Sequence, residues 1–308
     1  MPGVVEVSVV VPAYGAADVI VRQLDALAPQ VVAAAGEIVV VDDASPDATA
    51  AVVAAWAAAH PDVRCTVVQA RTRGYVNASR NAGIHFSAGT LVAVTDADDV
   101  VRPGWLDALR AAAAPGVVVS GVFVWPGEDV VHLPPTFYGI PGPTILGSTM
   151  LLSRRDFDAI GGFDESFRAG GSETEFALRA RFGAGMDIAV VPDAVIEYHV
   201  VQGWATQRRR FARQQAGFAI VARRLREIPG APRSTFTVRR RLRGALGYAG
   251  RVVLGGGPGR RTSLDRLWVE LVAVVRIAQC WWRRPPARLL DPARIDAGYR
   301  IVHPVPAA

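Results

Sequence analysis

Short valine-rich runs alternate with alanine-rich segments of helical spacing through the first hundred residues. The alternation predicts a mainly parallel sheet with helices on both faces, because consecutive parallel strands need a crossover helix between them. The predicted strands are Val4–Val11, Glu37–Val41, Val63–Val68 and Leu91–Thr95. The predicted helices are Ala17–Leu27, Asp47–Ala59 and Asn77–Phe86, with Ser45 as N-cap of the second and Pro46 in its first turn.

The pattern changes twice further along the chain. Residues 101–203 predict short helices (Pro103–Arg110, Arg155–Ile160, Glu173–Phe182) and strands (Val117–Val124, Met150–Leu152, Val195–His199) around a loop rich in Pro and Gly over 126–147. Beyond residue 200 the chain reads as helical, with Trp204–Arg226, a break at Pro229–Arg233, a glycine-rich link at Gly255–Gly259 and an apolar helix over 267–282. We therefore expect three parts: 1–100 and 101–203 as two halves of one α/β domain, and 204–308 as a helical region.

Polar side chains follow the predicted strands at the points where those strands end. Tyr14 follows the first strand, Asp42-Asp43 the second, and the acidic run from Asp96 to Asp99 the fourth. Ligands of open α/β sheets bind outside the carboxyl ends of the strands. The pattern therefore predicts a binding site at this edge.

Composition narrows the chemistry that this site can perform. The chain has 308 residues, 51% of them hydrophobic, so it can bury a large core. All 34 basic residues are arginine, which excludes a P-loop lysine, a Schiff-base lysine and the lysine of protein kinases. Two cysteines far apart in sequence, Cys65 and Cys280, argue against a disulfide scaffold and favour a reducing compartment.

Charge divides the chain into two unequal parts. Residues 1–200 carry 12 arginines against 23 acidic residues, a net of −11, whereas residues 201–308 carry 22 against 5, a net of +17. Arginines at 208–210, 213, 239–241 and 243, and the run Trp281-Trp282-Arg283-Arg284, suit the edge of an anionic membrane. The alternative is a helical subdomain whose arginines neutralise the acidic part. No recognition motif indicates nucleic acid.

Targeting signals are not apparent in the sequence. The N-terminus lacks the basic and apolar regions of a signal peptide, and no run of 18 uncharged apolar residues predicts a transmembrane helix. We expect a cytoplasmic protein, either free or peripheral on the inner face of the cell membrane.

Several candidate residues carry chemistry, and each also has a structural explanation. Asp96-Ala97-Asp98 can hold Mg²⁺ or Mn²⁺ whose shell is completed by phosphate oxygens, or can be a solvated acidic turn. His199 can be a further metal ligand or a surface residue. Glu173 or Glu175 can be a general base, or can stabilise a helix N-terminus. Arg80 can contact a nucleotide or form a structural salt bridge, and Tyr14 can stack on a base or lie half-buried in a loop.

Taken together, the motifs resemble the family 2 glycosyltransferases, inverting enzymes with the GT-A fold. The resemblance covers about residues 5–200 and rests on the order of its motifs. These are VSVVVPAYG, EIVVVDDASPDAT, GYVNASRNAGIHFSAGT, LVAVTDADD, LLSRRDFDAIGGFDESF, GGSETEFALRA and the strand-end YH. It implies that 1–100 binds a nucleotide diphosphate sugar and that 101–203 binds an acceptor hydroxyl on a glycan, a lipid-linked molecule or a small molecule.

The resemblance also assigns roles to matching residues. It implies that the donor is bound by Pro12, Ala13, Tyr14, Asp42, Asp43, Arg80, Asp96 and Ala97. Asp98, with His199, is implied as ligand of a Mn²⁺ or Mg²⁺ ion that bridges the diphosphate. Aligned on Gly171 and Glu175, Glu173 replaces the aspartate that serves as the family's base, so its carboxylate has a side chain one methylene longer.

Other functions compete with transfer of a sugar to an envelope or secondary-metabolite acceptor. The Ser172-Glu173 departure keeps open a GT-A protein that has lost catalysis and acts as a sugar-nucleotide-binding or membrane-surface scaffold. A sugar-nucleotide pyrophosphorylase needs a glycine-rich loop with a basic residue after the first strand, which PAYGAADV does not supply. A nicotinamide enzyme is excluded because no G-x-G-x-x-G follows that strand.

Overall fold

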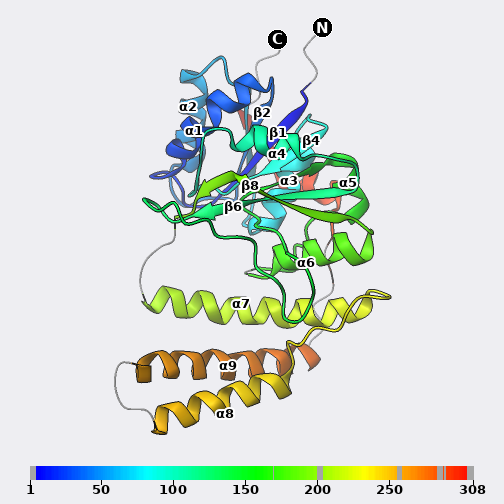
Figure 1. Cartoon of the computed structure of the whole chain (residues 1–308). Helices are drawn as coiled ribbons and strands as arrows, with labels where there is room; N and C mark the ends of the chain where they lie inside the picture. Colours follow the sequence, from blue (N-terminus) through cyan, green and yellow to red (C-terminus); the bar gives the residue numbers. More distant parts are fainter. Residues whose placement is uncertain are drawn as a thin grey trace.

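A nine-stranded mixed sheet forms the centre of the molecule (Figure 1). The computed structural model describes residues 5–168, 170–199, 204–254, 259–282, 287 and 289–303. Within these residues the strand order is β5-β8-β6-β7-β4-β1-β2-β3-β9. The parallel half contains β1 (Val7–Ala13), β2 (Glu37–Asp42), β3 (Cys65–Ala70) and β4 (Leu91–Val94).

The other half of the sheet mixes strand directions. It contains β5 (Val100–Val101), β6 (Val117–Val124), β7 (Met150–Ser153) and β8 (Asp187–Glu197). Strand β7 runs antiparallel between β4 and β6, while β6 and β8 are parallel. The sheet is therefore mixed, and the predicted parallel arrangement holds for β1 to β4.

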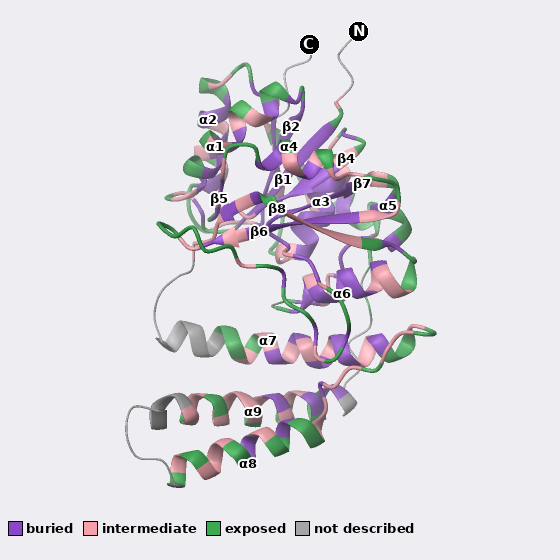
Figure 2. Ribbon diagram, viewed as in Figure 1, coloured by how far each residue is buried: buried purple, intermediate pink, exposed green. Residues whose placement is uncertain are grey.

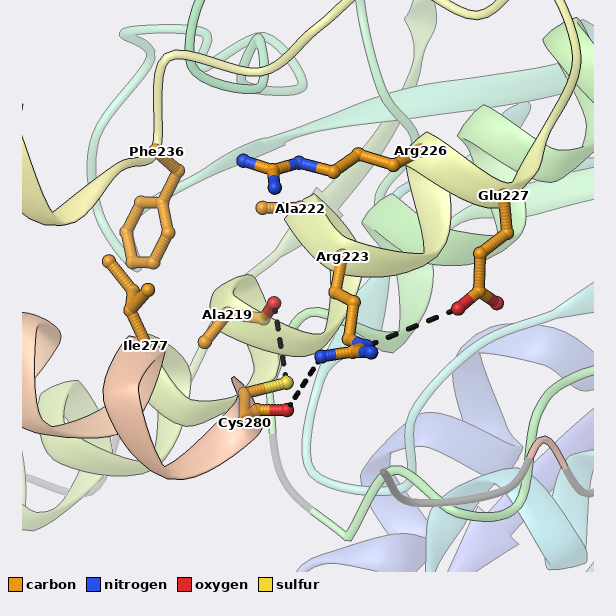
Figure 3. Close-up of a pocket in the computed structure, with 8 residues that line it drawn as sticks. All are labelled: Ala219, Ala222, Arg223, Arg226, Glu227, Phe236, Ile277 and Cys280. Carbon is orange, nitrogen blue, oxygen red and sulfur yellow. Dashed lines mark hydrogen bonds and ion pairs between the residues drawn. The ribbon is translucent and has the colours of Figure 1, made fainter. Parts of the chain in front are cut away.

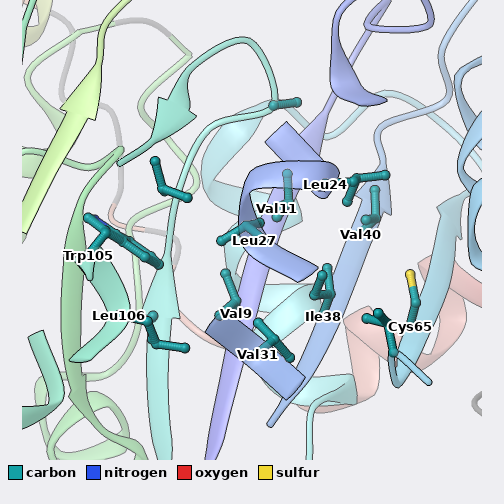
Figure 4. Close-up of a cluster of buried hydrophobic side chains, with 14 of the residues drawn as sticks. Val9, Val11, Leu24, Leu27, Val31, Ile38, Val40, Cys65, Trp105 and Leu106 are labelled. Atoms are coloured by element: carbon teal, nitrogen blue, oxygen red, sulfur yellow. The ribbon is translucent and has the colours of Figure 1, made fainter. Parts of the chain in front are cut away.

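Helices cover both faces of the sheet because its valine-rich strands are buried on both sides. Val9 and Val11 of β1 face α1 (Ile20–Ala33), α2 (Thr49–Ala59) and α4 (Trp105–Ala111) (Figure 4). Val10, between them, faces the opposite layer of α3 (Val76–Phe86), α5 (Arg154–Ile160) and α6 (Ser172–Leu178). The period of two along a strand produces this division. Figure 2 shows the strands mostly buried, with exposed positions along the helices that cover them.

Three long helices form a further layer on the side of α6 (Figure 1). They are α7 (Trp204–Arg224), α8 (Val238–Leu254) and α9 (Gly259–Trp282). Their own core joins them to the 126–147 loop and to α6 through side chains that include Phe137, Leu178, Phe236 and Ile277. The helical region therefore packs on the α/β domain, and α7 is the helix in contact with α6.

No helix in the described ranges combines the length and the apolar character that a membrane span requires.

The chain returns to the sheet after the helical layer. Helix α10 (Pro292–Gly298) packs beside α3, and β9 (Tyr299–His303) pairs antiparallel with β3. No strand was predicted for this segment. Its few residues are too short a run to show a period, and it gains strand structure from the unpaired edge of β3.

Local differences from the predicted elements have identifiable causes. Ser45 is not the N-cap of α2, because its hydroxyl accepts the Gly15 N–H (3.0 Å), and the N-cap residue is Ala48 without a side-chain cap. Helix α6 ends at Leu178 and continues as a π-helical turn over Arg179–Gly183. Strand β8 begins at Asp187, earlier than predicted, and ends two residues before His199.

Candidate active site

The predicted site residues gather at the carboxyl edge of β1, β2 and β4. These three strands run parallel, so their ends at Ala13, Asp42 and Val94 share one edge of the sheet. Tyr14, Asp43 and Asp96 lie just beyond those ends. The predicted edge is therefore where the structure brings the polar residues together.

Asp43 organises the loop that lies beside this edge. Its two carboxylate oxygens accept the backbone N–H groups of Gly74 (2.6 Å) and Tyr75 (2.9 Å), and Arg73 lies 4.0 Å away. Burial raises the pKa of Asp43, and the two N–H groups and Arg73 oppose that rise. Tyr75 has a φ of +69°, a left-handed conformation that costs a residue with a Cβ energy. The Asp43 bonds hold the 74–75 turn in that conformation.

Tyr14 is the exposed member of the group that was predicted to hold a nucleoside. Its side chain is 42% exposed, and the Arg73 guanidinium lies 3.6 Å from its ring centroid. Pro12 and Ala13 are buried within β1. Asp42 is buried too, and accepts hydrogen bonds from Ser45 N–H and the Gln69 amide. The stacked Tyr14 ring and Arg73 guanidinium thus offer a flat, cationic surface to a ligand, and the carboxylates of Asp42 and Asp43 are buried nearby.

Arg80 connects two separate parts of the site. It projects from α3, and its side chain is 1% exposed. Its guanidinium donates to Asp96 Oδ1 (3.0 Å) and to Glu173 Oε1 (3.2 Å). Ala97, the middle residue of the acidic motif, is buried behind them. The predicted base and the predicted nucleotide-binding acid are therefore held together by one buried cation.

Glu173 lies in the first turn of α6, with a carboxylate that is ionised at neutral pH. Burial alone raises the pKa of this carboxyl, but the charge of Arg80 and hydrogen bonds from Arg80 and Ser172 outweigh burial, so the pKa is lowered. Gly147 packs against both partners, because a Cβ there would lie 2.5 Å from Glu173 Cγ and 2.8 Å from the Arg80 nitrogens. Glu175, the other candidate base, instead pairs with Arg179 (2.8 Å).

A cluster of three carboxylates follows β4. The pKa of Asp98 is raised by burial and by the negative charge of Asp96. His199 and Arg210 oppose this rise without cancelling it. Burial and repulsion from Asp96 and Asp98 raise the pKa of Asp99 to about 8. His199 joins this cluster through its backbone N–H, which donates to Asp99 Oδ1 (3.1 Å).

This cluster suits a divalent cation, which relieves repulsion between neighbouring carboxylates. Among the described residues, no three His, Cys, Asp or Glu side chains form a complete metal site by themselves. Mg²⁺ needs only one or two protein carboxylates when phosphate oxygens and water fill the remaining positions, and imidazole suits Mn²⁺. Asp98 with His199 beside it therefore fits a metal that is held jointly with a phosphate-bearing ligand.

A cavity of about 480 Å³ lies away from this edge, in the helical layer (Figure 3). Arg223 donates to the Cys280 carbonyl (3.1 Å) at its wall, and Glu227 lies 4.0 Å from Arg223. The residues that line it are Ala219, Ala222, Arg223, Arg226, Glu227, Phe236, Ile277 and Cys280. None of the predicted site residues lines this cavity.

Sequence reasoning missed three residues that shape the site. Arg73 covers Tyr14, Tyr75 is held by Asp43, and Gly147 makes room for the Arg80–Glu173 pair. The first two lie in R-x-R-G-Y, a short polar and glycine-containing stretch after β3, which is the signal of a ligand loop. Gly147 lies in a loop without periodicity, so no pattern distinguishes it.

Comparison with known proteins supports the interpretation of this edge. The sequence model described as "Glycosyl transferase family 2" matches residues 8–163, just over half of the chain. The succinoglycan biosynthesis protein ExoO of Rhizobium meliloti (strain 1021) is 34% identical over an alignment of 227 residues that covers 64% of this chain. The alignment covers 62% of that relative, so the chain spans less than two thirds of the relative's length.

Solved structures share the fold. The mannosyltransferase PcManGT of Pyrobaculum calidifontis, in complex with GDP-Man and Mn²⁺, superposes with a TM-score of 0.56 at 21% identity, over 95% of this chain and 78% of that one. TarS 1-349 of S. aureus, in complex with UDP-GlcNAc, gives 0.51 at 18% identity, over 87% and 81%. Identities this low support the fold alone. The family match goes further: the chain has a GT-A fold and belongs to glycosyl transferase family 2.

Proposed function

We propose that this enzyme is a metal-dependent, inverting glycosyltransferase that moves a sugar from a nucleotide diphosphate sugar to an acceptor hydroxyl. The observation that carries the proposal is the buried Arg80, which bonds to both Asp96 and Glu173. Asp96, the proposed nucleotide-binding acid, follows β4, whereas Glu173, the candidate base, lies in α6. They are distant in the sequence, so only the fold brings them together. A shared buried cation that holds both is the arrangement that a reaction between two substrates needs.

The donor occupies the carboxyl edge of β1, β2 and β4 in this proposal. Tyr14 offers a ring face to the base, with Arg73 beside it, and Asp43 fixes the loop that borders the base. Asp96 faces the ribose and diphosphate. The structural neighbours in complex with GDP-Man and Mn²⁺ and with UDP-GlcNAc support a nucleotide sugar and a divalent ion. Asp98 and His199 would hold that ion, and its charge would help to neutralise the departing diphosphate.

Glu173 performs the proton transfer. Its carboxylate accepts the proton of the acceptor hydroxyl while the hydroxyl oxygen bonds to the anomeric carbon. The bond from that carbon to the diphosphate oxygen breaks on the opposite face, so the anomeric configuration inverts. Arg80 keeps Glu173 ionised and directs one carboxylate oxygen, which leaves the base ready before the acceptor arrives.

The acceptor is proposed from the relative's role. ExoO is named as a succinoglycan biosynthesis protein, which supports a polysaccharide or glycolipid acceptor in envelope synthesis; a secondary metabolite is a further candidate. Both cysteines are free thiols, as a cytoplasmic protein requires. We place the reaction in the cytoplasm, at the inner face of the cell membrane.

Thermal unfolding tests the donor site. With Mn²⁺ present, one nucleoside diphosphate of a panel is expected to raise the unfolding temperature, since ligand at 100 times its dissociation constant stabilises a protein by about 2.7 kcal/mol. Asp98→Ala is expected to remove that shift, whereas Asp107→Ala, an exposed carboxylate on α4, should retain it. No shift with any nucleotide would overturn the proposed donor site.

Transfer kinetics test the base. Glu173→Gln is expected to lower kcat by about 10²- to 10⁴-fold while the nucleotide-induced shift persists. Glu173→Asp, which restores the acid usual in the family, should retain more activity than Glu173→Gln. A wild-type enzyme that binds nucleotide but transfers no sugar to any acceptor would instead favour the scaffold function.

A further inference from the structure

Exposed large apolar side chains are concentrated on the two outer helices, α8 and α9. Seven such residues lie there, and the most exposed are Trp282 (89%), Val253 (81%) and Leu246 (73%). The other four are Leu242, Leu264, Leu271 and Val275. Figure 2 shows exposed positions recurring along both helices. A monomeric protein does not ordinarily leave this many large apolar side chains in water on one pair of helices.

The exposed apolar residues form one stripe on each helix. At about 100° per residue, Leu242, Leu246 and Val253 fall within about 40° of one another around α8. On α9 the four exposed residues named above (Leu264, Leu271, Val275 and Trp282) also fall within about 40°. We call these residues the α8 stripe and the α9 stripe.

Both stripes lie on the same side of the helix pair. Arg241 of α8 and Glu270 of α9 form an ion pair between the helices (3.2 Å), which marks the face that each turns to the other. Each of these residues lies about 120° from its own stripe, in the same rotational sense. In an antiparallel pair, which Figure 1 shows, equal rotations of the same sense bring both stripes to one side.

That side faces away from the catalytic domain. Ala273, Ile277 and Cys280 lie on the opposite side of α9 from its stripe, and they are buried in the core shared with α7. The Cys280 thiol donates to the Ala219 carbonyl of α7 (3.7 Å). Helix α7 thus fills the inner side of α9, and among the described residues no element is packed on the stripes.

Arginines flank the apolar surface. Arg239 and Arg243 lie within about 100° of the α8 stripe and border it on one side, whereas Arg240 and Arg251 lie about 140–160° from its centre, on the far side of the helix. All four are exposed, and within the described part of the chain none of them forms an ion pair. Helix α8 contains no acidic residue. An apolar stripe bordered by arginine alone is the pattern of a helix that lies in the headgroup region of an anionic membrane.

We propose that the paired α8 and α9 stripes form a membrane-binding face, which inserts shallowly among anionic lipids with its arginines against the headgroups. A second copy of the chain is a poor occupant, because a self-complementary contact would bring the two arginine flanks together. The predicted membrane-edge residues Trp281, Arg283 and Arg284 have side chains that lie outside the described part of the chain. The proposal is independent of the transfer reaction, since binding to lipid requires neither nucleotide nor metal.

Vesicle co-sedimentation of the full chain tests this face. Wild-type protein is expected to sediment with vesicles of phosphatidylcholine mixed with phosphatidylglycerol, and much less with phosphatidylcholine alone. Leu246→Glu combined with Val253→Glu should weaken that binding by about tenfold or more, because two carboxylates replace inserted apolar groups. The matched control is Val21→Glu with Val32→Glu, two exposed valines on α1, and it should bind as wild type does.

The outcomes distinguish the possible occupants. The proposal is overturned if the Leu246→Glu/Val253→Glu variant binds anionic vesicles as well as the wild type does. It is also overturned if the wild-type protein does not bind anionic vesicles. A wild-type dimer that this double variant converts to a monomer would assign the face to self-association and also overturn it. Thermal unfolding of each variant shows whether it is folded, and nucleotide-induced stabilisation, measured separately, reports on the donor site.

Discussion

Gly147 shows how closely one residue controls the candidate site. A methyl group there would meet Glu173 Cγ at 2.5 Å and both terminal nitrogens of Arg80 at 2.8 Å. Because the guanidinium is buried, it cannot move into solvent, so the partly exposed side chain of Glu173 must shift instead. The spacing between base and acceptor thus depends on the absence of a single Cβ.

Gly147→Ala is therefore expected to impair catalysis more than folding. A displacement of about 1 Å costs on the order of a hundredfold in rate. The measurement is kcat for transfer, with Gly247→Ala on α8 as control, since no atom lies within 4 Å of a Cβ there. An unchanged kcat in Gly147→Ala would show that catalysis does not depend on a fixed position of Glu173.

The burial of the two cysteines leads to a prediction about the reactivity of their thiols. Burial raises the pKa of the Cys65 thiol to about 12 and also raises that of Cys280. At pH 8 only about one Cys65 in ten thousand is then a thiolate, which is the reactive form. Native enzyme should show no rapidly reacting thiol with a disulfide reagent, and two after denaturation. Rapid native reaction, assigned with Cys65→Ser, would contradict this burial.

At the scale of elements, the strands and helices that show a clear hydrophobic period were predicted from the sequence. Elements that form only against another part of the chain were missed. Strands β1 to β4 and the helices between them were predicted because buried valine runs and turn residues reveal them locally. Strand β9 was missed because only the edge of β3 makes it a strand. Similarly, Asp96 and Glu173 were predicted from motifs, but their shared partner Arg80 depends on how α3 and α6 meet in space.

Helix α7 is attached to the catalytic domain by a buried ion pair. Arg224 at its end pairs with Asp164, and its guanidinium also donates to the Ser166 hydroxyl (2.8 Å). Removal of one member of such a pair leaves a buried charge and costs about 3–5 kcal/mol. Arg224→Ala should lower the free energy of unfolding by that amount, measured by urea denaturation. Arg226→Ala, an exposed arginine next in the chain, should change it by about 0.5 kcal/mol or less.

At the scale of the whole molecule, the end of the described chain stabilises its beginning. Strand β9 covers the edge of β3, and Tyr299 lies against the Asp43 loop, since a Cβ on Gly74 would be 2.9 Å from its hydroxyl. Arg294 pairs with Glu165 (2.6 Å), and Glu165 also accepts from Asn81 of α3. The last elements therefore support both the sheet and the loop that borders the donor.

Deletion of residues 299–303 is expected to affect stability and nucleotide binding together. The loss of the ladder hydrogen bonds to β3 and of the packing of the half-buried Tyr299 ring should cost about 3–5 kcal/mol in unfolding free energy. The nucleotide-induced shift in unfolding temperature should fall in the same variant. Val302→Thr, an exposed position on β9, serves as the control and should alter neither. A deletion that lowers stability but leaves nucleotide binding intact would show that Tyr299 does not support the donor loop.

The position of β9 also determines the order in which the protein can be completed during synthesis. Strands β1 to β4 leave the ribosome early, but the strand that closes their edge is made after all three long helices. Until then the β3 edge is an open template for another chain, and the valines on it are shielded only in part. The cell must protect the open β3 edge while the more than two hundred residues between β3 and β9 are translated, so codon choice and chaperone access over that stretch affect the yield of active enzyme.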